Sequence, residues 1–429
     1  MNKLKREAGL LQLVAYGMGN IIGAGIYVLA GVASGFAGNV VWAAFVIGAI
    51  IALFTGLSYA ELGSIYRKSA SEYTYVGKAF HNKPLSFVTE WTMLITEIVA
   101  VSTVALGFAR YFQVLIGIPI ILVAAALLIL LTMISIAGIK TTLRINTLLS
   151  ILAMLGLLIV IVGGTGKLGS VNYTYSPKGN EGIITASILV FFAFVGFDNI
   201  TNLSEETKKP DKLIPRGLLI SLLISTILYV AVGIAMVSLV PWQQLSISDA
   251  PLALAASVSF GSLGFTLLTI FALLTTFNTA LVLLIVGSRI IYGMAEAKAL
   301  PSLFGKLNRN GAPYMASLLV LIISIAFLSL GSIGRVAEIA SFGSLLVFIM
   351  INLSLLYLRK TEPNANRPFK TPLNISWVSI TALLGVVSCF ILLTQFDIKS
   401  LLLGLVLPIS GMIIYALTGR NYKITKGKK

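Results

Sequence analysis

The sequence predicts an all-α membrane protein with twelve transmembrane helices, and three observations support that class. The chain has 429 residues, of which 57% are hydrophobic and 11% are charged, whereas about a quarter of the residues in soluble proteins are charged. Apolar runs of roughly 20 residues, the length that crosses a bilayer as a helix, recur along the chain. Basic residues gather in alternate loops between these runs. We expect a single transmembrane domain, residues 1–429, without a separate soluble domain.

Each apolar run is interpreted as one membrane span. The run near 256–293 is long, and its start is expected to form a short surface helix. The basic start of the chain suggests a signal peptide, but the apolar run that follows is too long and is broken by glycine, so we expect the first span to remain. The predicted spans are residues 10–34, 40–63, 85–113, 118–138, 143–164, 183–200, 214–240, 256–293, 314–331, 335–358, 374–395 and 399–418.

Basic residues predict the orientation of these spans. If the N-terminus is inside, 26 of the 31 Lys and Arg residues lie on the inner side. This strong asymmetry predicts a multi-pass protein of the cell membrane with both termini in the cytoplasm. The net charge of +16 then sets the orientation and the contact with membrane lipid, so nucleic acid is not an expected partner. The residues on the outer side are Arg110, Lys167, Lys178, Arg335 and Lys399.

Glycines interrupt the first predicted span, where residues 18–27 read MGNIIGAGIY. Irregular backbone inside a membrane is tolerated where it is buried or lines a cavity. The free amides of a half-helix starting near Gly25 suit a carboxylate, and the carbonyls of the preceding half suit an ammonium. An α-amino acid carries both groups on one carbon. The alternative is close helix packing at Gly19, Gly23 and Gly25.

A second interruption falls in the sixth predicted span, where residues 191–199 read FFAFVGFDN. Gly196 lies among four phenylalanines, which suggests the wall and gate of a pocket. Paired interruptions in the two halves of a chain are the best sequence indication of a transporter's binding site. The adjacent Asp198 is expensive inside a membrane and therefore a functional candidate. Alternatively, Asp198 and Asn199 cap the half-helix that follows the break.

Other ionisable residues fall in or near the spans. Glu97 lies deep in the 85–113 span, where it can face a substrate amine or pair with a neighbouring polar group. The chain has one histidine and one cysteine, which allow no internal disulfide and no structural zinc site built from this pair. No metal-binding helix motif and no nucleophile–base pair is visible, so an enzyme is not expected.

Taken together, five motifs resemble the amino acid–polyamine–organocation (APC) superfamily of transporters over nearly the whole chain. Each motif is weak by itself, but their order and spacing are specific. They are residues 19–27 (GNIIGAGIY), 191–198 (FFAFVGFD), 205–216 (EETKKPDKLIPR), 288–301 (SRIIYGMAEAKALP) and 367–372 (RPFKTP).

The resemblance implies a fold of two inverted five-helix repeats, about 10–164 and 183–358, followed by two extra helices, about 374–418. The first and sixth helices are the broken ones, and the bundle that holds them rocks against the rest in alternating access. The resemblance also implies that the substrate carboxylate binds to the amides of residues 23–25 and that Phe192 is the gate above the substrate. The substrate-binding residues so implied are Ile22, Gly23, Ala24, Gly25, Ile26, Phe192, Ala193, Phe194, Val195 and Gly196, with Glu97 as the acid for a cationic side chain.

The sequence departs from the superfamily at one position. Many proton-coupled members carry a lysine in the fifth span, and the matching residue here is Ala153. Three alternatives remain for coupling: a sodium ion bound by oxygens of the first span and of the eighth; exchange without an ion; or protons carried by Asp198 or Glu97. No other cofactor is expected. The threonines of the eighth span can instead bond back to their own helix; they are Thr275, Thr276 and Thr279.

The leading hypothesis is a secondary active transporter that carries amino acids across the cell membrane. The alternatives are a polyamine carrier, which would leave the carboxylate site without a purpose, and a receptor that senses an amino acid with the carrier fold. A receptor needs a signalling domain or a partner surface, and the short tails show neither. The sequence leaves open the amino acid, the coupling ion, the direction of transport and the oligomeric state. A cationic substrate requires a deep acid such as Glu97; without it, a neutral substrate is favoured.

Overall fold

The computed structural model describes residues 8–23, 25–67, 71–137, 142–296, 299–308, 312–329 and 333–418, and almost all of its regular structure is helical. Short 3₁₀ or π segments carry the label η. The elements of the first half are α1 Leu10–Ile21, η1 Gly25–Leu29, α2 Ala30–Ala37, η2 Gly38–Val40, α3 Val41–Ile65, α4 Ser71–Phe80, α5 Lys83–Ile116, α6 Ile120–Ala137, α7 Thr142–Gly164 and η3 Thr165–Lys167.

The second half repeats the pattern of long helices after a broken first one. Its elements are α8 Gly179–Phe191, η4 Phe192–Phe194, η5 Asp198–Glu206, α9 Pro210–Leu239, α10 Trp242–Ile247, α11 Pro251–Glu296, η6 Ser302–Gly305, α12 Tyr314–Leu328, α13 Ile333–Thr361, β1 Asn374–Ile375, β2 Val378–Ser379, α14 Ile380–Leu393 and α15 Ile398–Thr418.

Eight stretches of the described residues are long and apolar enough to cross a membrane, and three shorter apolar helices accompany them. The first stretch, Leu10–Ile65, has 56 residues, which is enough for two passes. Large apolar side chains are exposed along the outer helices, for example Ile121 and Leu122 of α6 and Leu402 of α15. Exposed apolar surface of this extent identifies a multi-pass membrane protein.

In two places the helices of the structure do not coincide with the apolar runs that predicted them. Gly261 has φ +60° inside α11, so a leading segment is set off from the main helix, as the length of this run predicted. The run predicted at 374–395 starts as a short antiparallel hairpin, with Asn374 paired to Ser379, and its helix begins only at Ile380. The cause is local, because Leu373 and Ser376 both have positive φ values, which a helix does not allow.

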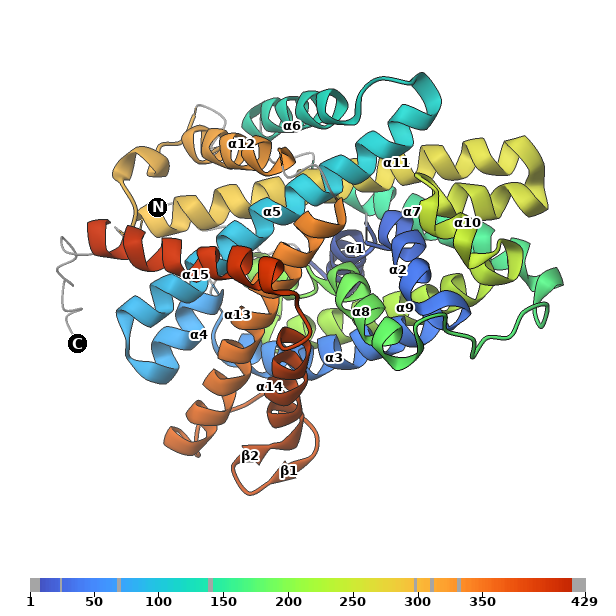
Figure 1. The fold of residues 1–429 in the computed structure, drawn as a ribbon. Coiled ribbons are helices and arrows are strands. Elements are labelled where there is room, and N and C mark those ends of the chain that lie inside the picture. Colours follow the sequence, from blue (N-terminus) through green and yellow to red (C-terminus); the bar gives the residue numbers. More distant parts are fainter. Residues whose placement is uncertain are drawn as a thin grey trace.

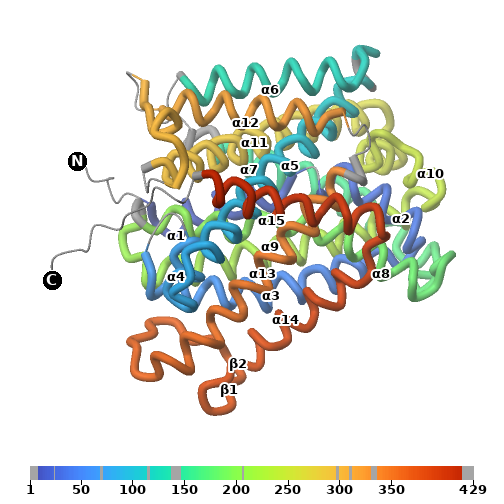
Figure 2. The backbone as a smooth tube through the Cα atoms, turned by 60° about the vertical axis from the view of Figure 1, so that its left-hand side comes forward, coloured from blue at the N-terminus to red at the C-terminus, as the bar shows by residue number. Residues whose placement is uncertain are grey.

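The helices form two groups that enclose the core. Helices α1, α3, α8 and α9 form the first group, in which α9 contacts α1 and α3, and α3 contacts α8; α5, α6, α11 and α12 form the second group. In Figures 1 and 2 α6 and α12 lie side by side at one edge of the molecule, and α14 with the β1–β2 hairpin lies at the opposite edge. Helix α13 contacts both α3 of the first group and α5 of the second. The broken segments therefore lie in the interior, where other helices cover them.

Candidate functional site

The first helix is broken at the predicted glycines. Helix α1 ends at Ile21, and Ile22 has an extended backbone with φ −78° and ψ 98°. A π-helical turn begins at Gly25 and continues into α2. Ala24, which was predicted to bind substrate, lies outside the described residues. The backbone amides and carbonyls around this break are therefore not all used within the helix.

The second break follows α8. A single 3₁₀ turn, η4, ends at Phe194, Val195 is extended with ψ 138°, and Gly196 has φ +108°. A residue with a Cβ rarely adopts such a φ, so the chain needs glycine here. The Asp198 carboxylate accepts a hydrogen bond from the amide of Gly196 at 3.2 Å. Asp198 thus satisfies the break itself rather than the first turn of η5.

The two breaks are in direct backbone contact. A Cβ placed on Gly25 would lie 2.5 Å from the Cβ of Ala193 and would overlap its Cα. The hydroxyl of Tyr229, on α9, lies 2.7 Å from the carbonyl oxygen of Ile21 and 3.1 Å from that of Ala193. One buried hydroxyl therefore bonds to a carbonyl at each break. Sequence reasoning missed Tyr229, although it is the only tyrosine of the span predicted at 214–240, which was a usable signal.

A cavity lies between the breaks and the second group of helices. Its volume is about 20 Å³, room for about one water molecule, so a ligand fits only after the walls move apart. Of the predicted binding residues, Gly23, Gly25, Phe192 and Val195 line it. The wall also includes apolar side chains that the sequence did not single out. They are Ile21 of α1, Ala100 and Val104 of α5, and Leu283 of α11.

Asn20 also lines this cavity and was missed as a binding residue, although it lies within the first motif. Its side chain is 3% exposed. Neither its amide nitrogen nor its oxygen has a hydrogen-bond partner among the described residues. A buried amide without partners is costly and calls for an explanation. Because both atoms belong to a residue of the cavity wall, Asn20 can donate to a ligand and accept from it.

The remaining predicted binding residues are buried around the cavity without lining it. Phe194 packs against Tyr229, with ring centroids 5.2 Å apart, and Ile26 is fully buried. The carbonyl of Ile22 accepts a hydrogen bond from Thr279 at 3.3 Å. Ala193 and Gly196 contribute backbone at the second break. These residues shape the breaks instead of presenting side chains to the cavity.

Glu97 is fully buried and lies one helical turn from Ala100 on α5, but it does not line the cavity. One of its oxygens lies 3.5 Å from the side-chain amide of Asn199, and the other has no partner among the described residues. Asp198 precedes this asparagine. Neither acid forms an ion pair with any Lys or Arg that the structure describes. The two coupling candidates therefore lie on one side of the cavity, toward the predicted cytoplasmic end.

The threonines of α11 behave differently from one another. Thr275 and Thr276 bond back to carbonyls of their own helix, at 2.6 and 2.7 Å. The Thr279 hydroxyl instead reaches the carbonyl oxygens of Gly19, at 3.2 Å, and of Ile22. Thr279 thus connects α11 to the first broken helix, and it also lines the cavity.

Ala153, the position at which the resemblance implies a lysine in proton-coupled transporters, is buried on α7. Its carbonyl accepts a hydrogen bond from Tyr27 at 2.8 Å. The carbonyl of Tyr27 in turn accepts one from Tyr111 of α5, at 2.6 Å. The backbone around Ala153 is thus fixed to the second half of the broken first helix.

Comparison with known proteins agrees with this architecture. A family model described as "Amino acid permease" matches residues 9–415. The branched-chain amino acid permease BcaP of Bacillus subtilis is 31% identical to this chain, over 98% of the chain and 94% of the relative. A methylthioribose transporter of the same organism is 28% identical, over 86% and 84%. The vacuolar cationic amino acid transporter 4 of Arabidopsis thaliana is 29% identical, over 85% of this chain and 65% of the relative.

Proposed function

The chain belongs to the amino acid permease family, and we propose that it moves a small neutral amino acid across the membrane by alternating access. Family membership makes it an amino acid transporter and not an enzyme. The observation that carries the proposal is the contact between the two breaks beside a cavity. Unwound backbone in the membrane is typical of the substrate sites of transporters.

The head of the substrate would lie against the breaks. Amides near Gly23 and Gly25 would bind its carboxylate, at the start of the second half-helix. Carbonyls of the breaks would bind its ammonium; those of Ile21 and Ala193 already accept from Tyr229, but a carbonyl oxygen has two lone pairs and can accept again. The Asn20 amide would add a bond to either group. Phe192 would cover the substrate as a gate.

The substrate side chain would lie against Ala100, Val104 and Leu283. These groups are apolar, and among the described residues no ionisable side chain lines the cavity. A charged substrate group would lose its hydration there without a partner. The proposal therefore favours a neutral, apolar side chain, as the name of the branched-chain relative suggests, over the cationic substrates of the plant relative. A polyamine has no carboxylate that the amides could bind. It carries two or more positive charges, which the apolar wall cannot pair.

A cationic substrate is the second candidate, and one observation favours it. The free oxygen of Glu97 lies one helical turn from the wall, so a long basic side chain could reach it if the wall moved. The two candidates differ in an uptake competition. For the neutral candidate, leucine and valine should compete with one another for uptake, and each should be taken up faster than lysine or arginine. Glu97→Gln should leave leucine uptake measurable. Dominant lysine uptake that Glu97→Gln abolishes would establish the second candidate.

For coupling we keep sodium, exchange and protons as alternatives. Oxygens of Gly19, Ile22 and Thr279 converge within 3.3 Å, but three ligands are fewer than the six or more that a hard cation usually takes. Asp198 and Glu97 are the groups that could carry protons. Uptake measured with and without sodium, across pH, and with internal amino acid separates the three. Asp198→Asn should change the pH profile only in the proton case.

The twelve spans and the inverted repeat also remain proposals. Eight long apolar stretches, three shorter helices and the double length of Leu10–Ile65 together account for twelve passes. The broken α1 and α8 begin the two halves, each followed by four further spans, which supports repeats of opposite topology. The basic loops favour a cytoplasmic position for both termini.

The decisive experiment is uptake of labelled amino acids into proteoliposomes that contain the purified protein. Uptake of a neutral amino acid that unlabelled leucine competes away supports the proposal. Binding of an amino acid without uptake would indicate a receptor. Uptake of a sugar derivative such as methylthioribose without any amino acid would overturn the zwitterion site.

A further inference from the structure

Helices α3 and α13 are joined by polar contacts on successive turns. Thr55 and Ser58 of α3 face Asn352 of α13. The side-chain nitrogen of Asn352 donates to the Thr55 hydroxyl at 2.9 Å, and the Ser58 hydroxyl donates to the Asn352 oxygen at 2.6 Å. All three side chains are fully buried. A buried polar network with every partner in place fixes one arrangement of the helices that share it.

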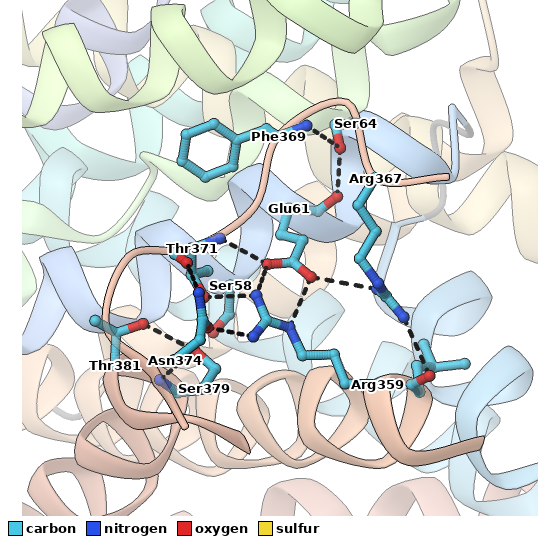
Figure 3. Close-up of polar contacts among 12 residues, drawn as sticks. Ser58, Glu61, Ser64, Arg359, Arg367, Phe369, Thr371, Asn374, Ser379 and Thr381 are labelled. Atoms are coloured by element: carbon cyan, nitrogen blue, oxygen red, sulfur yellow. Dashed lines mark hydrogen bonds and ion pairs between the residues drawn. The ribbon is translucent and has the colours of Figure 1, made fainter. Parts of the chain in front are cut away.

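One turn further along α3, Glu61 makes the next polar contact between α3 and α13, an ion pair with Arg359 that we call the Glu61–Arg359 joint (Figure 3). Arg359 of α13 donates to both carboxylate oxygens, through Nε at 2.8 Å and through Nη2. Arg367 contributes a second ion pair at 3.2 Å, and the amide of Thr371 donates at 2.8 Å. The side chains of Glu61 and Arg359 are 0% and 2% exposed. Removing one partner of such a pair leaves an uncompensated buried charge, so the pair resists separation.

Aromatic packing attaches α13 to the same group of helices. Phe348 contacts Tyr59 of α3 at a centroid distance of 5.8 Å, and it contacts Phe191 and Phe197 beside the second break at 6.0 and 5.2 Å. From Phe348 to Arg359, the helix is therefore bonded or packed to α3 and to the broken sixth helix. Both belong to the first group of helices.

Helix α13 also contacts α4, α14, α15 and α5, and its interface with α5 is of another kind. Within the described part of α13, side-chain hydrogen bonds to other helices reach α3, α8 and α15, and none reaches α5. The helices approach closely where a Cβ on Gly343 would lie 3.2 Å from the Cβ of Thr96. Packed helices without interhelical hydrogen bonds can slide by small shear movements.

We propose that α3 and the Phe348–Arg359 part of α13 move as one body, and that α13 slides against α5 when the protein changes between its two access states. This inference rests on the alternating-access function proposed above. In this proposal the Glu61–Arg359 joint makes the predicted cytoplasmic part of α13 move together with the broken helices. The inner path of the substrate would then open at the α5 side of α13.

Distances between spin labels test this division. Cysteines at Leu53 on α3, Leu353 on α13 and Ile121 on α6 replace side chains that are 39%, 37% and 52% exposed. The only native cysteine, Cys389, is first changed to alanine. With saturating substrate, the 53–353 distance should stay constant while the 121–353 distance shifts. A shift of the 53–353 distance would overturn the proposal.

If neither distance shifts, cross-links decide the question. The Ser58→Cys/Asn352→Cys pair ties α3 to α13, and the Thr96→Cys/Gly343→Cys pair ties α5 to α13. Closing the first pair should preserve most of the uptake, and closing the second should lower uptake by about tenfold, reversibly on reduction. Loss of uptake with the first pair, or full uptake with the second, contradicts the proposal. Uptake by the uncross-linked protein is the separate test of the transport function.

If the reduced Thr96→Cys/Gly343→Cys variant fails to fold, Glu61→Gln replaces it. This variant leaves two arginines without their carboxylate. It should lower the rate of uptake and leave the affinity for substrate unchanged. The distribution of the 53–353 distance between the spin labels should become broader. The charge-reversed pair Glu61→Arg/Arg359→Glu should narrow that distance again. An unchanged 53–353 distance in Glu61→Gln would show that the joint does not hold the two helices together.

Discussion

The backbone of Gly25 lies directly against that of Ala193, so the two interrupted helices touch at the point where both lose their regular structure. This contact gives Gly25 a packing role as well as a place in the cavity wall. The packing interpretation of the first glycine motif therefore holds for Gly25, and its role in binding the carboxylate stays a prediction. The contact also changes what a substitution at Gly25 should do.

Gly25→Ala should separate the two breaks and reduce both stability and substrate binding. An added Cβ would overlap backbone atoms of Ala193, which cannot move aside as a flexible side chain could. Overpacking of this kind costs about 1–3 kcal/mol. Thermal unfolding in detergent, with and without substrate, measures the effect. Gly166→Ala is the matched control because nothing lies within 4 Å of its Cβ position; equal stability of the two variants would contradict the contact.

Tyr229→Phe should weaken substrate binding while the protein still folds. The change removes the hydroxyl that reaches carbonyls at both breaks, and a buried group left unsatisfied costs about 1–3 kcal/mol. Equilibrium binding of the labelled substrate gives the loss in affinity. The control is Tyr175→Phe, whose side chain is 49% exposed. Unchanged affinity in Tyr229→Phe would mean that the breaks hold their geometry without this bond.

Asn20→Ala should lower substrate affinity by about tenfold without lowering stability, because its amide has hydrogen bonds to offer only to a ligand. Loss of a buried, unpaired amide can even raise the unfolding temperature. Ser225→Ala is the control, since its hydroxyl is also buried without a partner but does not line the cavity. If Asn20→Ala binds substrate as the parent does, the amide takes no part in the site.

Phe192→Ala should reduce uptake by about tenfold and impair transport more than folding, because a gate acts on the transport cycle, although loss of a buried ring also lowers stability. Phe192 lines the cavity and is 6% exposed. Uptake and unfolding are measured on the same preparation. Phe260→Ala, at a side chain that is 43% exposed, controls for loss of an aromatic ring. Normal flux through Phe192→Ala would remove the gate role.

Glu72→Gln should make stability less dependent on pH. Glu72 lies on α4, outside the predicted spans, and burial raises its pKa above the ordinary value of 4.5, although hydrogen bonds from Ser71 and Tyr59 oppose the shift. A carboxyl whose pKa is raised by folding stabilises the protein while protonated, and this stabilisation is lost as pH rises from about 4.5 through the raised pKa.

The parent should therefore unfold at lower temperatures as pH rises through that window, and Glu72→Gln should show a flatter curve. Glu362→Gln is the control, because Glu362 is exposed. Parallel curves for the parent and Glu72→Gln would show that this carboxyl is not the group responsible.

Much of the molecule follows from local sequence. The apolar runs give the long helices because a bilayer-length segment must satisfy its own backbone. The positions of both breaks follow from Gly23, Gly25 and Gly196, since glycine marks where a helix stops being regular. The family resemblance also follows from the order of short motifs along the chain.

Tertiary structure decided which atoms meet, because that depends on contacts between residues far apart in the chain. It brought Tyr229 to both breaks and turned Phe194 into a packing residue. It also left the Asn20 side chain in the cavity wall without a hydrogen-bond partner among the residues that the structure describes. It also paired Glu61 with Arg359, 298 positions away. Local patterns specify where a membrane helix must break, but only packing specifies which side chain satisfies the break and which is left for a ligand.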